Sequence, residues 1–237
     1  MNAAVIVAGG SGERFGSIGG KQLAMVAGAP VLRHTVDAFA RCAAIDAIVV
    51  VTDPGRVEEY RTLAVDPVGS PKVVAVVPGG ATRQASVGAG ISAVPAGVQT
   101  IVVHDGARPL VTPETIAEVV EALAADTTLD GVVIGHPSYD TLKTVDAACR
   151  VRGTLDRNAI WAAQTPQAFR ADALRRAYAR ATELGIQGTD DSALVEAAGG
   201  AVLMLTGPRD NIKVTVSGDL RFVEQVLAAR KGADLDA

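Results

Sequence analysis

Glycines and two cations lie close together near the start of the chain. Gly9, Gly10 and Gly12 follow an apolar run, and Arg14 and Lys21 stand shortly after them. Because glycine has no Cβ, such a loop lets backbone N–H groups close on a polyphosphate. A guanidinium can bind two phosphate oxygens at once, whereas an ammonium supplies a compact point charge. The two cations among these glycines therefore indicate electrostatic stabilisation of a reacting phosphate rather than solvated loop charges.

Two common phosphate-binding motifs do not fit this loop. A dinucleotide fingerprint needs the spacing G-x-G-x-x-G, but Gly10, Gly12 and Gly16 contain one residue too many. A P-loop needs a glycine six positions before its lysine and a hydroxyl directly after it, and those positions hold Phe15 and Gln22. The remaining pattern suits nucleotidyl transfer. In that reaction charge builds around an α-phosphorus, and catalysis is mostly positioning and electrostatic stabilisation.

Further candidate site residues lie next to apolar runs. Asp105 and Arg108 end such a run in VHDGARP, where open α/β sheets bind ligands, although a pair of this kind can also be a structural salt bridge. Lys213 lies in the alternating segment Ile212–Val216, which predicts a strand whose lysine points away from an apolar face. The three histidines show no metal-ligand spacing and are interpreted as structural: His34, His104 and His136.

Apolar runs alternate with helical patterns over most of the chain. Continuous Val/Ile runs, typical of parallel strands buried on both faces, predict strands at Ala3–Ala8, Ala47–Thr52, Val73–Val77, Thr100–His104, Gly131–Gly135 and Ala201–Thr206. Helical spacing predicts helices at Pro30–Cys42, Arg56–Ala64, Gln84–Ala93 and Pro113–Ala124. This alternation predicts an α/β fold with a mostly parallel, doubly wound sheet that binds ligands at the carboxyl ends of its strands.

The stretch 137–164 interrupts this alternation. Two β-like pieces, Thr141–Val145 and Arg150–Leu155, flank a turn-like segment and predict an inserted hairpin. A lone hairpin has no core of its own, so it must pack on something else to be stable. It is either a tolerated surface loop or a dimerisation arm.

Composition narrows the class of protein. The 237 residues are 49% hydrophobic and 20% charged, which predicts a globular chain long enough for one α/β domain. A formal net charge of −4 argues against a partner of duplex nucleic acid. No targeting segment or run long enough to span a membrane is recognised. Cys42 and Cys149 are isolated. We therefore expect a soluble cytoplasmic protein that binds neither nucleic acid nor membrane.

Seven motif blocks occur in the order found in one family. They read AGGSGERFG…GGKQ, GGATRQASV, VHDGARP, DTLKTV, TLDRN…WAAQTPQAF, TDDSALVE and DNIKVT. In these blocks the chain resembles the 2-C-methyl-D-erythritol 4-phosphate cytidylyltransferases of the non-mevalonate isoprenoid pathway. The resemblance implies a single Rossmann-like nucleotidyltransferase domain over 1–237. It also implies a homodimer in which the inserted arm, 137–164, reaches the partner's active site.

The resemblance also implies a role for each matched residue. Arg14 and Lys21 would stabilise the pentacoordinate transition state, and Lys213 would act with them in catalysis. The nucleotide would contact Ala8, Gly9, Gly10, Gly80, Arg83 and Ser86. The second substrate would contact Asp105, Arg108, Thr141 and Thr189. Arg157, on the arm, would reach into the partner's site beside Thr141 and hold the attacking phosphate.

The implied reaction is attack of a polyol phosphate on the α-phosphorus of CTP, with release of pyrophosphate. Magnesium would be bound largely by the phosphates of CTP, with Asp105 as a weak protein ligand. A ribitol-5-phosphate cytidylyltransferase stays open, because it shares the fold and most motifs and its substrate also presents a phosphate. Other sugar-phosphate nucleotidyltransferases that use UTP or GTP, and a non-catalytic nucleotide sensor, stay open as well. A sensor would not need the Arg14 and Lys21 pair.

Overall fold

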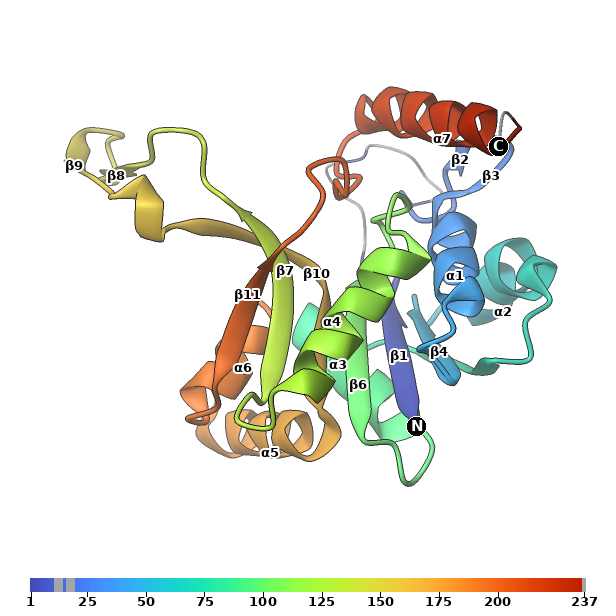
Figure 1. Ribbon diagram of the computed structural model, residues 1–237, viewed down its shortest axis with the longest axis horizontal. Coiled ribbons are helices and arrows are strands. Elements are labelled where there is room, and N and C mark those ends of the chain that lie inside the picture. The colour runs from blue at the N-terminus through green and yellow to red at the C-terminus, as the bar shows by residue number, and fades with distance from the viewer. Residues whose placement is uncertain (11–14, 16–19, 236–237) are drawn as a thin grey trace.

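A central sheet of seven strands organises the protein (Figure 1). The computed structural model describes residues 1–10, 15 and 20–235. Its strands lie in the order β11-β7-β10-β6-β1-β4-β5. Their bounds are β1 Asn2–Val7, β4 Ala47–Thr52, β5 Val73–Pro78, β6 Thr100–Asp105, β7 Gly131–Pro137, β10 Trp161–Arg170 and β11 Val202–Thr206. All neighbouring strands are parallel except β10, which is antiparallel to both β6 and β7. The six predicted strands and the mostly parallel sheet are confirmed.

The continuous apolar runs form strands because both faces of the sheet are covered. In β1, Ala4 and Ile6 face one hydrophobic cluster, whereas Ala3 and Val5 face the other. The next strand, β4, alternates in the same way and is buried at every position. Since successive side chains of a strand point to opposite faces, both sets must be apolar when helices pack on both sides.

Helices lie on both faces of this sheet (Figure 1). The helices α1 and α4 and the segment that begins with α2 contribute to the first cluster, and α3, α5 and α6 contribute to the second. Their bounds are α1 Val31–Arg41, α2 Val57–Tyr60, α3 Arg83–Ala93, α4 Pro113–Ala125, α5 Ala171–Leu184 and α6 Asp191–Ala197. The predicted helix over Arg56–Ala64 is α2 continued by a π-helical turn, Arg61–Val65. The other three predicted helices are confirmed within two residues at each end.

A third hydrophobic cluster joins the last helix to the first part of the chain. Helix α7, Asp219–Leu235, places Val223 against Phe15, Val26 and Leu110. It lies over a short hairpin of β2, Met25–Val26, and β3, Ala29–Pro30.

The predicted inserted hairpin is present and projects from one end of the sheet (Figure 1). It consists of β8, Lys143–Val145, and β9, Val151–Thr154, which pair antiparallel. The last part of the predicted arm belongs instead to the sheet, because residues 161–163 of β10 pair with β7. The arm of the structure is therefore residues 138–160.

Several elements were not predicted, and one prediction is wrong. The antiparallel strand β10 and the helices α5, α6 and α7 carry no prediction from the apolar pattern. The segment Ile212–Val216, which was predicted as a strand, is not one in the structure. It is held instead by single contacts, such as the Val214 N–H donating to the Ala107 carbonyl at 2.8 Å. Val214 packs in the third hydrophobic cluster rather than on the sheet.

Candidate functional site

A cleft of about 360 Å³ opens beyond the carboxyl ends of β1 and β6. Three cationic side chains and one carboxylate are among the residues that line it. The lining residues are Val7, Gly9, Gly10, Lys21, Gln22, Gly80, Ala81, Thr82, Arg83, Ser86, Asp105, Ala107 and Lys213. This is the edge at which the doubly wound fold was expected to bind a ligand.

Glycines bring backbone close to this cleft. A Cβ on Gly9 would lie 3.0 Å from the Thr52 carbonyl oxygen, so a side chain there would press against the neighbouring strand. A Cβ on Gly80 would lie 2.5 Å from that of Ala85, at the start of α3. The Gly80 N–H donates to the Ser86 hydroxyl at 3.1 Å. Glycine at these two positions thus lets the backbone at Gly9 and at Gly80 lie close to the cleft, where a larger residue would displace it.

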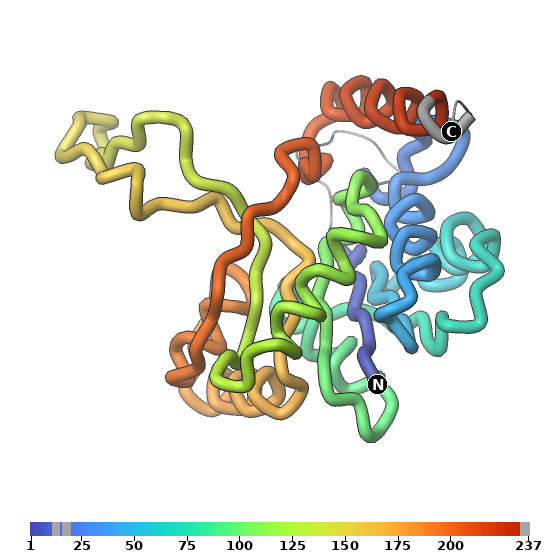
Figure 2. Tube along the Cα trace, viewed as in Figure 1, coloured from blue at the N-terminus to red at the C-terminus, as the bar shows by residue number. Residues whose placement is uncertain are grey.

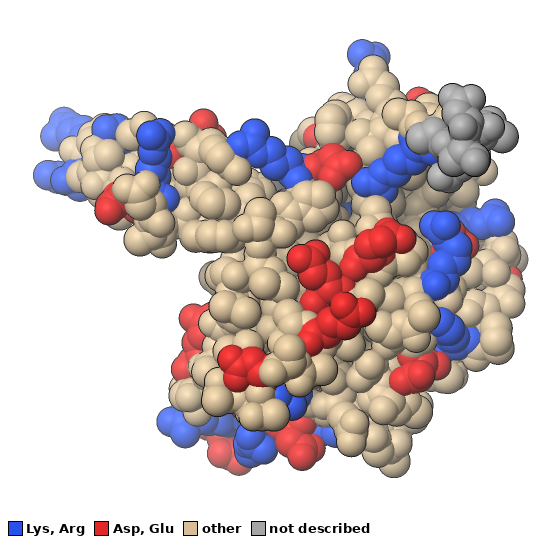
Figure 3. Space-filling view, in the orientation of Figure 1, with Lys and Arg blue, Asp and Glu red and all other residues tan. Residues whose placement is uncertain are grey.

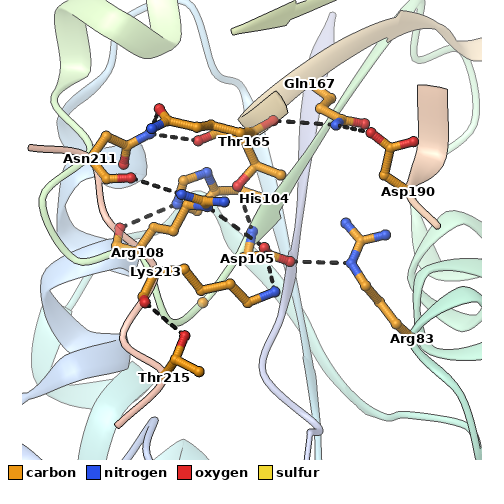
Figure 4. Close-up of polar contacts among 12 residues, drawn as sticks. Arg83, His104, Asp105, Arg108, Thr165, Gln167, Asp190, Asn211, Lys213 and Thr215 are labelled. Carbon is orange, nitrogen blue, oxygen red and sulfur yellow. Dashed lines mark hydrogen bonds and ion pairs between the residues drawn. The ribbon is translucent and has the colours of Figure 1, made fainter. Parts of the chain in front are cut away.

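Asp105 is the centre of the charged groups in this cleft (Figure 4). Its Oδ1 accepts from Arg83 Nε at 3.2 Å, and its Oδ2 lies 2.8 Å from Lys213 Nζ. Arg108 Nε is 3.7 Å from Oδ2. The side chain of Asp105 is only 8% exposed, and its backbone N–H donates to the Thr165 hydroxyl at 3.0 Å. Both carboxylate oxygens therefore have a fixed orientation relative to the cleft.

The cations around Asp105 determine its protonation. Burial alone would raise the pKa of the Asp105 carboxyl, but Arg83, Lys213 and Arg108 hold that pKa well below its usual range. Burial likewise opposes the charged form of Arg83, yet Asp191 and Asp105 raise the pKa of its guanidinium. The carboxylate is thus ionised and the guanidinium charged at neutral pH.

The residues behind Asp105 form a buried support. The Asn211 amide donates to the Thr165 carbonyl at 2.9 Å, and Arg108 Nη1 donates to the Asn211 carbonyl at 2.8 Å (Figure 4). His104 is fully buried against Phe39, and burial lowers the pKa of its imidazole to about 3. A neutral buried His104 agrees with its interpretation as structural. These contacts hold the loop that carries Lys213 against the end of β6.

The structure brings most of the sequence-predicted residues together. Those that line the cleft are Gly9, Gly10, Lys21, Gly80, Arg83, Ser86, Asp105 and Lys213. Ala8 is buried and Arg108 is mostly buried, neither of them among the lining residues, and Arg14 lies outside the described residues. Thr189, which precedes α6, is exposed and is not among the lining residues. Thr141 and Arg157 are exposed on the arm and do not line this cleft either.

Two residues that support the site from behind Arg83 were not predicted. Arg83 Nη2 donates to Asp191 Oδ2 at 2.8 Å, and the Tyr178 hydroxyl donates to Asp191 Oδ1 at 2.5 Å. Asp191 lies in the TDDS block, so its motif was recognised, but only Thr189 was selected from it. Tyr178 lies on α5, a helix for which there was no prediction, and nothing in the local sequence marks it.

The described residues contain no ready-made metal centre and no membrane span. Nowhere among them do three His, Cys, Asp or Glu side chains gather in a way that could hold a metal ion. Within the same residues, every helix is too short or too polar to cross a bilayer.

Comparisons with known proteins agree with the geometry. The family model for 2-C-methyl-D-erythritol 4-phosphate cytidylyltransferase (IspD) matches residues 2–229. The chain is 40% identical over 230 residues to the protein of that name from Pelotomaculum thermopropionicum, with 97% of this chain and 95% of the relative covered. The protein of that name from Symbiobacterium thermophilum is 42% identical over 224 residues, with 94% and 91% covered.

Solved structures of the same kind share the fold. The 4-diphosphocytidyl-2C-methyl-D-erythritol synthase of Anaerococcus prevotii has a TM-score of 0.81 and 28% identity, with 96% of this chain and 98% of that chain covered. The 2-C-methyl-D-erythritol 4-phosphate cytidylyltransferase of Thermus thermophilus has a TM-score of 0.75 and 32% identity, with 95% and 98% covered. The resemblance inferred from the motif blocks is confirmed, and the chain belongs to the 2-C-methyl-D-erythritol 4-phosphate cytidylyltransferase (IspD) family.

Proposed function

We propose that this protein transfers the cytidylyl group of CTP to 2-C-methyl-D-erythritol 4-phosphate. A phosphate oxygen of the second substrate attacks the α-phosphorus of CTP in line. A new phosphoanhydride bond forms while the bond to the β-phosphate oxygen breaks, so the products are 4-diphosphocytidyl-2-C-methyl-D-erythritol and pyrophosphate. The observation that carries the proposal is the cleft itself, in which glycine backbone, Lys21, Arg83 and Lys213 surround one ordered carboxylate, Asp105.

The cations of the cleft have different roles in the proposed reaction. Lys21 lines the cleft together with Gly9 and Gly10, so its ammonium can stabilise charge that develops on the triphosphate. Arg14 would act with it. Lys213 is held in the cleft by its ion pair with Asp105, at 2.8 Å, and in this proposal its ammonium binds the phosphate of the second substrate. The chain thus works by orienting two anionic substrates and stabilising the transition state.

Magnesium is part of the proposal. Asp105 is the only carboxylate among the described residues that line the cleft, and carboxylate oxygens suit this hard cation. Both of its oxygens already have cationic partners, so the phosphates of CTP would supply most of the ligands. When bound, the metal would neutralise charge on those phosphates.

A homodimer with shared sites is proposed from the arm. Tyr139, Val145 and Val151 are each more than half exposed, an unusual amount of apolar surface for a hairpin this small. Arg157 and Thr141 lie on this arm, away from the cleft of their own chain. A partner cleft would give both residues the ligand that the family resemblance assigns to them. In this proposal residues 1–237 form one domain, and the enzyme works in the cytoplasm, where CTP is made and thiols stay reduced.

The names of the curated relatives favour methylerythritol phosphate over ribitol phosphate as the second substrate. A pyrophosphate-release assay tests this choice with four nucleoside triphosphates and both polyol phosphates in the presence of magnesium. We expect rapid release only with CTP and methylerythritol phosphate. A site whose polar groups match the edge of cytosine leaves some of them unpaired with any other base, uracil included, and unpaired polar groups are costly. A preference for ribitol 5-phosphate would overturn the substrate assignment but keep the reaction class.

A further inference from the structure

Asp191 is a buried carboxylate that does not line the cleft. It is 0% exposed, although Asp is among the residue types that proteins rarely bury without partners. Its Oδ2 accepts from Arg83 Nη2 at 2.8 Å and its Oδ1 from the Tyr178 hydroxyl at 2.5 Å. Both partners come from other helices, α3 and α5. Asp191 thus links helices α5 and α6 to Arg83, a residue that lines the cleft.

The neighbouring carboxylate, Asp190, has a different task. Asp190 is the N-cap of α6, and its Oδ1 accepts from the Ala193 N–H at 3.0 Å. Its Oδ2 accepts from the Gln167 amide at 2.9 Å, which fixes the start of the helix to β10 (Figure 4). Since Asp190 already caps the helix, the contacts of the Asp191 side chain are not needed to start it.

Arg83 connects Asp191 to Asp105. Its Nε donates to Asp105 Oδ1 at 3.2 Å while its Nη2 donates to Asp191 Oδ2. A guanidinium is planar, so contacts from two of its nitrogens to two anchored carboxylates fix its orientation as well as its place. With Nε of Arg83 on Oδ1, the other oxygen of Asp105 is turned to Lys213.

We propose that Asp191, held by the hydroxyl of Tyr178, is a positioning residue that fixes the Arg83 guanidinium against Asp105. Asp105 then keeps the orientation in which it holds Lys213 in the cleft. Asp191 touches no substrate in this account and acts only through Arg83. The inference rests on the proposed function in so far as the orientation of Asp105 and Lys213 affects turnover.

A double-mutant cycle tests whether Asp191 acts through Arg83. Asp191→Asn keeps the shape of the side chain but removes its charge, and Arg83→Lys keeps a cation but removes the planar set of donors that contacts both carboxylates. We expect each substitution to lower kcat/KM by about 10- to 100-fold, a size that small displacements of reacting groups can cause. Because Asp191 acts through Arg83, the double variant should be no more than about threefold worse than the worse single variant. Losses that multiply would overturn the proposal.

Two further variants protect the test against misfolding. Tyr178→Phe removes only the hydroxyl, so it should cost about three- to tenfold in kcat/KM in the wild-type background and nothing measurable in the Arg83→Lys background. Asp190→Asn is the matched control. It removes the charge of the adjacent carboxylate while the remaining oxygen of asparagine can still cap the helix, and the contact to Gln167 that it loses does not involve Arg83. The loss in kcat/KM should therefore be much smaller than that in Asp191→Asn. A loss in Asp190→Asn as large as that in Asp191→Asn would contradict the inference.

A spectroscopic readout separates this inference from the proposed function. The Nε–H signal of Arg83 in the ¹⁵N NMR spectrum is assigned by its absence in Arg83→Lys. Asp191→Asn and Tyr178→Phe should shift or broaden that signal, and Asp190→Asn should leave it unchanged. An inactive wild type whose Arg83 signal responds in this way would refute the proposed function alone. If the wild type is active but its Arg83 Nε–H signal does not change in Asp191→Asn, the positioning role alone is refuted.

Discussion

Lys21 contributes the cation that the glycine-lined part of the cleft presents to a triphosphate. It lines the cleft together with Gly9 and Gly10, whose backbone groups remain when the side chain is removed. We predict that Lys21→Ala lowers kcat by about 10²–10³-fold, as the loss of one transition-state donor typically does. The affinity for CTP should fall much less. Steady-state kinetics and calorimetric titration with CTP measure the two effects, and equal losses in both would indicate ground-state binding instead.

The contribution of Asp105 to the stability of the fold depends on pH, because its cationic partners shift its pKa. Arg83, Lys213 and Arg108 overcome the effect of burial and hold its pKa below the usual range, whereas the unfolded chain restores a value of about 3.9. At a pH between the folded-state and unfolded-state pKa values, the unfolded chain binds more protons than the folded one. The stability that Asp105 supplies is therefore fully present above its unfolded-state pKa and is lost as the pH falls toward its folded-state pKa.

Replacing Asp105 should therefore matter least in acid. We predict that Asp105→Asn lowers the free energy of unfolding by about 2–3 kcal/mol at neutral pH, less than for a fully buried pair because Arg83 and Lys213 are partly exposed. Urea unfolding of both proteins should give a constant difference down to about pH 4 and a narrower one below it. A difference that stays constant below about pH 4, or that widens as the pH falls, would show that Asp105 does not have the depressed pKa.

At the scale of residues, a site is predictable where a local motif carries the chemistry. Lys21, Arg83, Asp105 and Lys213 were each found from a motif block and lie together in the cleft. The contact between Arg83 and Asp191 spans 108 positions of the chain, and no local pattern specifies such a pair. Arg157 was predicted from the motif alone, and the cleft of its own chain does not test it.

At the scale of elements, burial on both faces made the parallel strands predictable. β10 was missed because its sequence, WAAQTPQAFR, has no run of Val or Ile. Its buried polar side chains are satisfied by specific partners instead, such as Gln167, which donates to Asp190 and accepts from the Ser192 N–H. The prediction of a strand at Ile212–Val216 failed because an alternating pattern also fits an extended segment that buries one side without pairing.

Helix α3 packs on the sheet through a glycine, and this predicts opposite effects for two substitutions. A Cβ on Gly90 would lie 2.3 Å from Val5 Cγ1 and 2.9 Å from Val51 Cγ2, whereas one on Gly88 would meet Tyr178 no closer than 3.7 Å. Gly88→Ala should stabilise the protein by about 0.5–1 kcal/mol through helix propensity. Gly90→Ala should destabilise it by about 1–3 kcal/mol through overpacking. Urea unfolding measures both, and stabilisation by Gly90→Ala would contradict the close packing of α3 on β1 and β4.

At the scale of the whole molecule, the arm and the cleft are separate features of one chain. The tube in Figure 2 shows the arm projecting away from the body that carries the cleft. The space-filling view shows basic side chains gathered over the tip of the arm, where Lys143, Arg150 and Arg152 are exposed (Figure 3). Acidic side chains lie over α4 on the same face of the body. An arm with this charge and this reach is suited to the anionic ligands of a second cleft.

In the proposed homodimer, each active site combines the cleft of one chain with Arg157 of another. Lys21→Ala and Arg157→Ala homodimers should each be nearly inactive. When the two are mixed in equal amounts and allowed to exchange, half of the dimers are mixed, and each mixed dimer has one site without either lesion. We predict recovery of about a quarter of the wild-type activity, half of the dimers times half of their sites. No recovery, with exchange confirmed by a tag on one variant, would place Arg157 in the site of its own chain and rule out shared active sites.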